Sequence, residues 1–134
     1  MLRIAAVLLA TDEDAVALID GERRVDRDVR TLREGGCGPI AVVTGAVPIE
    51  VLGGLIVPDP RWRDGPESSV RAGLAALPPR TGSALLARTG APGLTPGAVR
   101  QAIEAGARPP ADLDLEHTAG PVLLDLSHRA NRIP

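Results

Sequence analysis

Short apolar runs bounded by glycine or proline recur along the chain, with longer polar-patterned segments between them. The runs are rich in Val, Ile, Leu and Ala and show no alternation of polar and apolar positions. This pattern is typical of strands that are buried on both faces of a sheet. It predicts four strands, at 2–10, 39–45, 52–58 and 82–87.

The segments between these runs carry apolar residues at helical spacing. Val25, Val29 and Leu32 fall on one stripe, and Gly35 and Gly36 follow as a C-cap. Two further helices are predicted at 68–77, with Ser68 or Ser69 as N-cap, and at 95–106, with Thr95 as N-cap and Pro96 in the first turn.

Strands that alternate with helices predict βαβ units. We therefore expect one α/β domain over 1–134, a Rossmann-like three-layer fold with a mainly parallel sheet. After Gly106 the pattern weakens, so 106–134 is interpreted as an irregular tail with a possible last strand at 121–126. In such sheets ligands bind at the carboxyl ends of the strands.

Composition narrows the possible functions. The net charge is −2, the chain has no Tyr or Phe, and its apolar runs are far shorter than the ~20 residues of a membrane span. Nucleic acid and membranes are therefore not expected as partners. One cysteine, Cys37, and two histidines exclude a disulfide and disfavour a Cys/His zinc site, so we expect a cytoplasmic protein.

The segment 58–77 holds the strongest candidate chemistry. Gly65 would let the backbone approach a ligand, and the N–H groups of Ser68 and Ser69 at a helix N-terminus would attract an anion. Arg71 would add a bidentate phosphate contact. The alternative is an ordinary capped helix in which Trp62 is a packing anchor and Arg71 is solvated.

This segment resembles the W-x-x-G-x-x-S-S-x-R-x-G-L motif of the MobA/MocA-like nucleotidyltransferases. These enzymes transfer a nucleotide from GTP or CTP to the molybdenum cofactor and related acceptors. The resemblance covers about 2–105, and the positions that match the motif are Trp62, Gly65, Ser68, Ser69, Arg71, Gly73 and Leu74.

The sequence departs from the family pattern at two places. Family members follow the first strand with a glycine-rich phosphate loop that ends in Lys, whereas Ala10 is followed by Thr11 and three acids, with Asp14 at the Lys position. The family's G-D-x-P segment supplies a Mg²⁺-binding Asp, and Gly90 stands in its place. Acids beside a triphosphate would repel it unless a metal intervened.

We therefore predict a degenerate, non-catalytic relative, a pseudoenzyme of molybdenum cofactor chemistry, for which Mg²⁺ would be a cofactor only if the protein were active. It would bind a small anionic, nucleotide-like or pterin-like ligand, or regulate a complete relative as a protein partner. Two alternatives stay open. In one, Asp12, Glu13 and Asp14 hold Mg²⁺ and the chain transfers CTP or GTP to a molybdopterin-like or other phosphorylated acceptor. In the other, it is a structural protein that forms a homo-oligomer.

Overall fold

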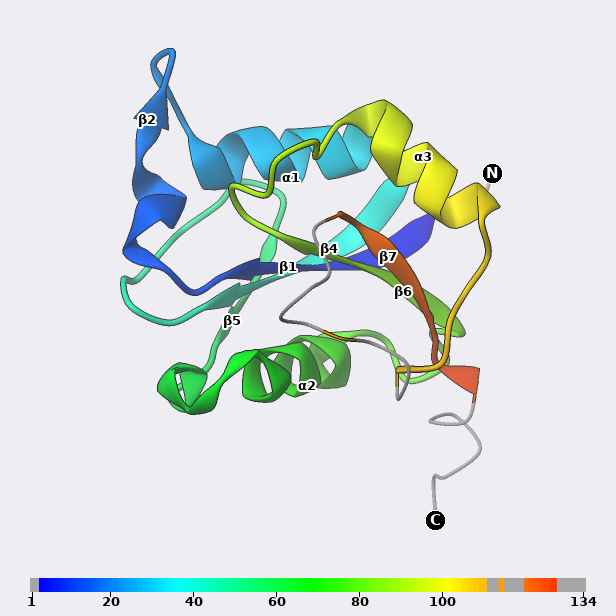
Figure 1. Cartoon of the computed structure of the whole chain (residues 1–134). Coiled ribbons are helices and arrows are strands. Elements are labelled where there is room, and N and C mark those ends of the chain that lie inside the picture. Colours follow the sequence, from blue (N-terminus) through cyan, green and yellow to red (C-terminus); the bar gives the residue numbers. More distant parts are fainter. Residues whose placement is uncertain (1–2, 111–113, 115–119, 128–134) are drawn as a thin grey trace.

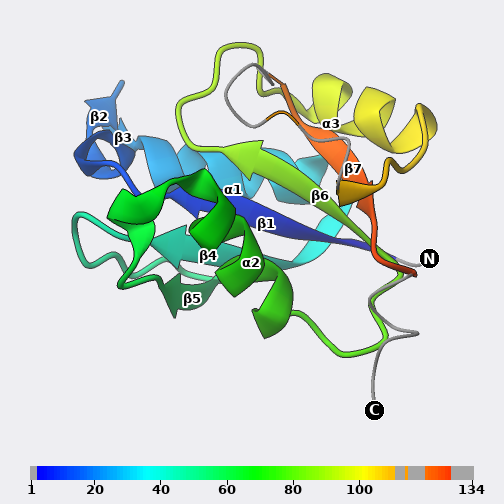
Figure 2. The same cartoon turned by 60° about the horizontal axis from the view of Figure 1, so that its bottom comes forward.

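The main sheet of the molecule is sandwiched between helices, as the computed structural model shows for residues 3–110, 114 and 120–127 (Figure 1). Within these residues it has five strands, ordered β5 (Leu55–Pro58), β4 (Cys37–Thr44), β1 (Ile4–Ala10), β6 (Ser83–Arg88) and β7 (Val122–Asp125). Helices α1 (Arg24–Glu34) and α3 (Pro96–Glu104) cover one face, and α2 (Pro66–Ala76) covers the other (Figures 1 and 2).

The sheet is parallel except at one edge. β5, β4, β1 and β6 run in the same direction, whereas β7 pairs antiparallel with β6. The predicted three-layer α/β fold and its mainly parallel sheet are confirmed, as is a last strand near 121–126. The rest of the predicted tail lies largely outside the described residues.

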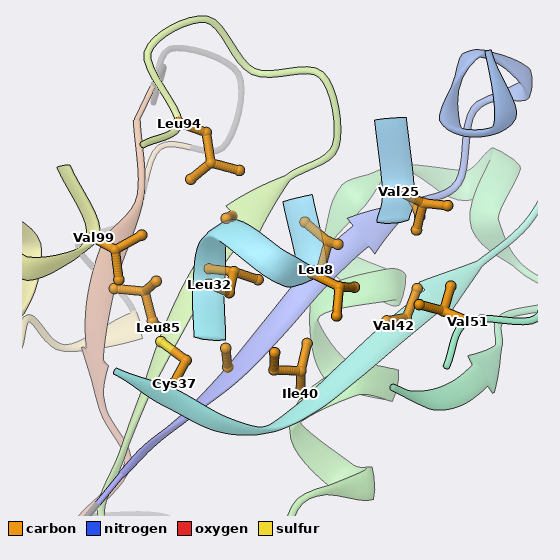
Figure 3. Close-up of a cluster of buried hydrophobic side chains, with 14 of the residues drawn as sticks. Leu8, Val25, Leu32, Cys37, Ile40, Val42, Val51, Leu85, Leu94 and Val99 are labelled. Atoms are coloured by element: carbon orange, nitrogen blue, oxygen red, sulfur yellow. The ribbon is translucent and has the colours of Figure 1, made fainter. Parts of the chain in front are cut away.

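Alternate residues of β1 pack into two separate hydrophobic cores, one on each face of the sheet. Ala6 and Leu8 point toward α1 and α3, where they meet Val25 and Leu32 in a tightly buried cluster (Figure 3). Val7 and Leu9 point to the opposite face, toward Val70 of α2. Because side chains alternate along a strand, a central strand with helices on both faces must be apolar at every position.

The ends of α1 and α3 follow the predicted capping signals. Gly35 is the C-cap of α1, and Gly36 adopts a φ of 103°, a conformation in which glycine avoids the penalty of a Cβ. The hydroxyl of Thr95 accepts a 3.0 Å hydrogen bond from the backbone N–H of Ala98 and so caps α3.

The predicted start of α2 is wrong. The helix begins at Pro66, and its N-cap is Gly65, three residues before Ser68 and four before Ser69. Pro66 favours the first helical turn because its fixed φ suits that position and no N–H is needed there. Ser68 and Ser69 lie inside the helix, and their hydroxyls donate hydrogen bonds to Asp59.

A small hairpin after β1 was not predicted. A short 3₁₀ turn η1 (Glu13–Val16) leads into β2 (Leu18–Ile19), which pairs antiparallel with β3 (Glu22–Arg23). Asp20 and Gly21 turn the chain with φ values of 52° and 81°. An Asp-Gly pair with positive φ is the preferred two-residue hairpin turn, so the signal was present in the sequence.

None of the helices within the described residues is long and apolar enough to cross a membrane.

Close contact between α2 and the sheet depends on Gly73. A Cβ at this position would lie 2.4 Å from Val7 Cγ1 and 2.9 Å from Val43 Cγ2. Alanine normally stabilises a helix interior by about 1 kcal/mol over glycine, but here overpacking opposes that gain. We predict that Gly73→Ala lowers the free energy of unfolding in urea by about 1–3 kcal/mol.

The matched control is Gly82→Ala, because a Cβ on Gly82 meets nothing within 4 Å. It should change the free energy of unfolding by less than about 0.5 kcal/mol. A Gly73→Ala protein as stable as the wild type would contradict the tight packing of α2.

Candidate functional site

A cavity of about 360 Å³ opens at the carboxyl edge of the sheet. Three segments line it: the end of β1 and the residues after it, the segment that leads into α2, and the end of β6. This is the place where ligands bind in parallel α/β sheets. Its lining includes Thr11, Asp12, Trp62, Arg63, Gly65, Ser69, Arg88 and Thr89.

Two arginines and one acid are among the residues that line the cavity. Arg63 comes from the 3₁₀ turn η2 (Trp62–Asp64), and Arg88 is the last residue of β6. Asp12 is the one acid among the residues that line the cavity. Two guanidinium groups against one carboxylate favour an anionic ligand, because guanidinium binds carboxylate and phosphate oxygens through paired hydrogen bonds.

Trp62 forms a wall of this cavity and is held from two sides. A Cβ on Gly45, just after β4, would lie 2.5 Å from Trp62 Cγ, so glycine is required for the indole to pack there. The guanidinium carbon of Arg63 lies 5.1 Å from the ring centroid, within cation–π range. Trp62 also borders a second, more apolar cavity of about 510 Å³ next to the 45–49 loop and β5.

The segment that bears Trp62 is fixed by the buried carboxylate of Asp59. Its Oδ2 accepts hydrogen bonds from the hydroxyls of Ser69 (2.8 Å) and Ser68 (2.9 Å), and its Oδ1 accepts from the backbone N–H of Arg61 (3.0 Å). Asp59 is only 5% exposed. The negative charge of Asp59 thus lies near the N-terminal end of α2, where it interacts favourably with the helix dipole.

These hydrogen bonds also set the charge state of Asp59. Burial alone would raise its pKa, but the hydrogen bonds from Ser69, the Arg61 N–H and Ser68, with the charge of Arg61, outweigh burial and lower it. Asp59 is therefore ionised at neutral pH.

The structure places the residues of the predicted anion site in three environments. Trp62, Gly65 and Ser69 line the cavity together. The Ser68 hydroxyl is directed to Asp59, and Arg71 is exposed on α2 and is not among the cavity-lining residues. The Ser68 and Ser69 hydroxyls thus serve an internal carboxylate.

The three consecutive acids separate as well. Asp12 lines the cavity, whereas Glu13 and Asp14 lie exposed in η1. In the part of the chain that is described, no three His, Cys, Asp or Glu residues gather as metal ligands would. A single carboxylate beside two guanidinium groups does not fit a resident Mg²⁺ ion, and the magnesium assignment to Asp12, Glu13 and Asp14 stays a prediction.

Sequence reasoning missed Asp59, Arg63 and Arg88. Asp59 and Arg88 had a usable signal, because each stands at the carboxyl end of a predicted parallel strand. Arg63 had none, since its place in the cavity depends on how η2 turns.

We predict that Asp59→Ala lowers the free energy of unfolding by about 2–3 kcal/mol, because it leaves the buried Ser69 hydroxyl without its acceptor. Asp59→Asn keeps a carbonyl acceptor, so it should lower the free energy of unfolding by less than Asp59→Ala does. The control is Asp64→Ala in the same segment, since Asp64 forms an exposed ion pair with Arg61. In urea denaturation, this control should lower the free energy of unfolding by at most about 1 kcal/mol. Equal losses for Asp59→Ala and Asp64→Ala would contradict the assigned role.

The Asp59 contribution should also depend on pH. Its folded-state pKa lies below the ordinary value of 3.8, so ionised Asp59 stabilises the fold above that pH. The contribution should fade as the pH falls below 3.8 through the lowered folded-state value. Urea midpoints of the wild type and Asp59→Asn should therefore converge in acid, and a constant gap would contradict the lowered pKa.

Several solved structures share this fold. Rv0371c from Mycobacterium tuberculosis H37Rv superposes with a TM-score of 0.65 and 19% identity, over 78% of this chain and 60% of that one. A nucleotidyl transferase from Methanothermobacter, Mth528, superposes with a TM-score of 0.63 and 16% identity, over 76% of this chain and 57% of that one. The chain thus spans less than two thirds of these two proteins. At such identities the likeness shows the fold alone.

A third structure is matched over more of its length. A 4-diphosphocytidyl-2C-methyl-D-erythritol synthase from Anaerococcus prevotii DSM 20548 gives a TM-score of 0.67 and 14% identity, over 97% of this chain and 75% of that one. A search among curated protein sequences found no match.

The family of this chain is identified by comparing its sequence with protein-family models. The family model described as the MobA-like NTP transferase domain matches residues 12–123, which is most of the 134-residue chain. The match includes the segment around Trp62 and Ser69, the end of β6 and the start of β7. The chain therefore belongs to the MobA-like NTP transferase domain family.

Proposed function

We propose that this protein binds a small anionic ligand, nucleotide-like or phosphorylated, in the 360 Å³ cavity and does not transfer nucleotides. The observation that carries the proposal is the pair of guanidinium groups, Arg63 and Arg88, beside the indole of Trp62 at the carboxyl edge of the sheet. The guanidinium groups bind the anion, and the indole offers a flat apolar surface for an attached ring.

The loop after β1 supports the non-catalytic half of the proposal. Only Thr11 and Asp12 separate β1 from η1, so the segment has no glycine-rich loop to cradle a triphosphate with its N–H groups. The family Lys, which would neutralise the charge of departing pyrophosphate, has no counterpart, because the chain contains no Lys and Asp14 is exposed.

The loop after β6 supports it independently. At Gly90, where the family places its metal-binding Asp, φ is 79°, which strains any residue with a Cβ, and that Cβ would lie 3.2 Å from Nη1 of Arg24. The Gly90 N–H donates a 2.9 Å hydrogen bond to Asp28. This backbone is shaped for glycine, and a metal-assisted transfer would have to recruit its ligands elsewhere.

The intrinsic fluorescence of Trp62 provides a direct test, because the chain has one Trp and neither Tyr nor Phe. We predict that inorganic pyrophosphate, CTP or GTP changes this fluorescence with a dissociation constant below millimolar, without Mg²⁺. Arg88→Ala should weaken binding by about tenfold or more, the equivalent of one charged hydrogen bond. The control is Arg80→Ala, which removes an exposed Arg outside the cavity and should leave binding unchanged.

Arg63→Ala needs a second readout because Arg63 touches the reporter ring. Its binding is measured by thermal unfolding, in which ligand at 100 times its dissociation constant stabilises the fold by about 2.7 kcal/mol. No response of the wild type at millimolar ligand, or equal binding by Arg88→Ala, would contradict the proposal. Mg²⁺-dependent release of pyrophosphate from CTP or GTP, with the nucleotidyl group passing to an added phosphorylated acceptor or to water, would contradict the non-catalytic half of the proposal.

A further inference from the structure

A buried carboxylate outside the cavity holds part of the cavity wall. Asp28, in the second turn of α1, is 7% exposed, and its Oδ2 accepts a 2.9 Å hydrogen bond from the backbone N–H of Gly90. The two residues are 62 positions apart in the sequence. The bond therefore joins the helix on one face of the sheet to the turn that follows β6.

That turn starts from Arg88, the last residue of β6, and both Arg88 and Thr89 line the cavity. Its successive N–H groups all have acceptors: Thr89 donates to the carbonyl of Leu9 (2.9 Å), and Ala91 donates to the carbonyl of Arg88 (3.2 Å). Gly90 is the member of this series that donates to a side chain. One of the three hydrogen bonds that hold the turn is therefore made to a group whose charge can change.

We infer that Asp28 is a positioning residue for the anion-binding cavity: through the Gly90 N–H it holds the 88–91 turn so that Arg88 and Thr89 stand at the cavity wall. The inference rests on the proposed function for its ligand, but the position of the turn can be measured without one.

The charge of Asp28 is coupled to this contact. Burial raises its pKa, while the Gly90 hydrogen bond and the charges of Arg27 and Arg24 lower it, with burial prevailing. Because the hydrogen bond favours the ionised carboxyl, protonation must weaken the bond to Gly90. The turn should therefore loosen at a pH above the range in which ordinary carboxyls titrate.

Other titratable groups lie on the elements that pack against α1. Arg23 of β3 is paired with Asp26, and Arg100 of α3 donates to the carbonyl of Glu34. The remaining groups are Glu13 and Asp14 of η1, Glu22 of β3, Cys37 of β4 and Glu104 of α3. The pKa of Asp28 is set by burial and by Gly90, Arg27 and Arg24.

The test compares the wild type with Asp28→Asn, Asp28→Ala and the control Asp26→Asn, a neighbouring acid on the exposed side of α1. Urea denaturation first establishes that each variant is folded. In ¹⁵N-labelled protein, the Gly90 amide signal of the wild type should titrate with Asp28. That titration should be absent in Asp28→Asn and present in Asp26→Asn. The Arg88 and Thr89 amide signals should shift in Asp28→Ala.

Pyrophosphate binding, followed by Trp62 fluorescence, supplies the functional readout. At pH 7 Asp28→Ala should weaken binding about fivefold or more, and Asp28→Asn should retain it within about twofold because the amide oxygen still accepts the Gly90 N–H. On acidification the affinity of the wild type should fall toward that of Asp28→Asn, because protonated Asp28 offers the Gly90 N–H a neutral carbonyl oxygen, as the amide does. Comparison at each pH cancels the protonation of pyrophosphate itself.

The two ideas fail in different ways. If pyrophosphate binds neither to the wild type nor to any variant, the proposed function fails. In that case a Gly90 titration, together with shifted Arg88 and Thr89 signals in Asp28→Ala, still supports the positioning role. If pyrophosphate binds to Asp28→Ala as tightly as to the wild type, or if the Gly90 signal does not titrate, the positioning role is overturned and the proposed function stands.

Discussion

Hydrogen bonds to the Asp59 carboxylate fix the segment on which most of the candidate site is built. Asp59 leaves β5 at its carboxyl end and joins the Arg61 N–H to the hydroxyls of Ser68 and Ser69 in α2. Between these anchors the chain presents Trp62, and the indole then packs on Gly45. A buried, ionised carboxylate thus helps to determine where the aromatic wall of the cavity stands.

The same arrangement shows how a chain of this family could keep a cavity at the edge of the sheet without transferring nucleotides, as we propose for this protein. The cavity walls come from strand ends and from the start of α2, which the packing of the two cores requires in any case. The family resemblance assigns phosphate handling to a glycine-rich loop, a Lys and a metal-binding Asp. In this chain those parts are replaced by a two-residue connection, an exposed acid and a glycine in the positive-φ region. Arg63 and Arg88 line the cavity, so the proposed binding of an anion does not depend on those parts.

Much of the fold was predictable because its signals are local. Buried apolar runs mark the four parallel strands, and Thr95 and Gly35 mark helix ends through their own capping geometry. The start of α2 was not found because Ser68 and Ser69 look like caps by residue type, while their hydroxyls are engaged by an acid nine or ten positions earlier. The candidate site divides in the same way. Trp62, Gly65 and Ser69 meet as the motif suggests, but Arg71 faces outward from α2, and the link between Asp28 and Gly90 spans 62 positions that no periodicity connects.

The most direct test of the central claim is to map, in ¹⁵N-labelled protein, which backbone amide signals shift when inorganic pyrophosphate is added. An anion held between Arg63 and Arg88 predicts that the largest shifts occur at Thr11, Gly65, Ser69 and Thr89, all of which line the cavity. Shifts confined to the exposed arginines of α1, such as Arg27 and Arg30, or no shifts at millimolar pyrophosphate, would contradict an anion-binding site at the carboxyl edge of the sheet.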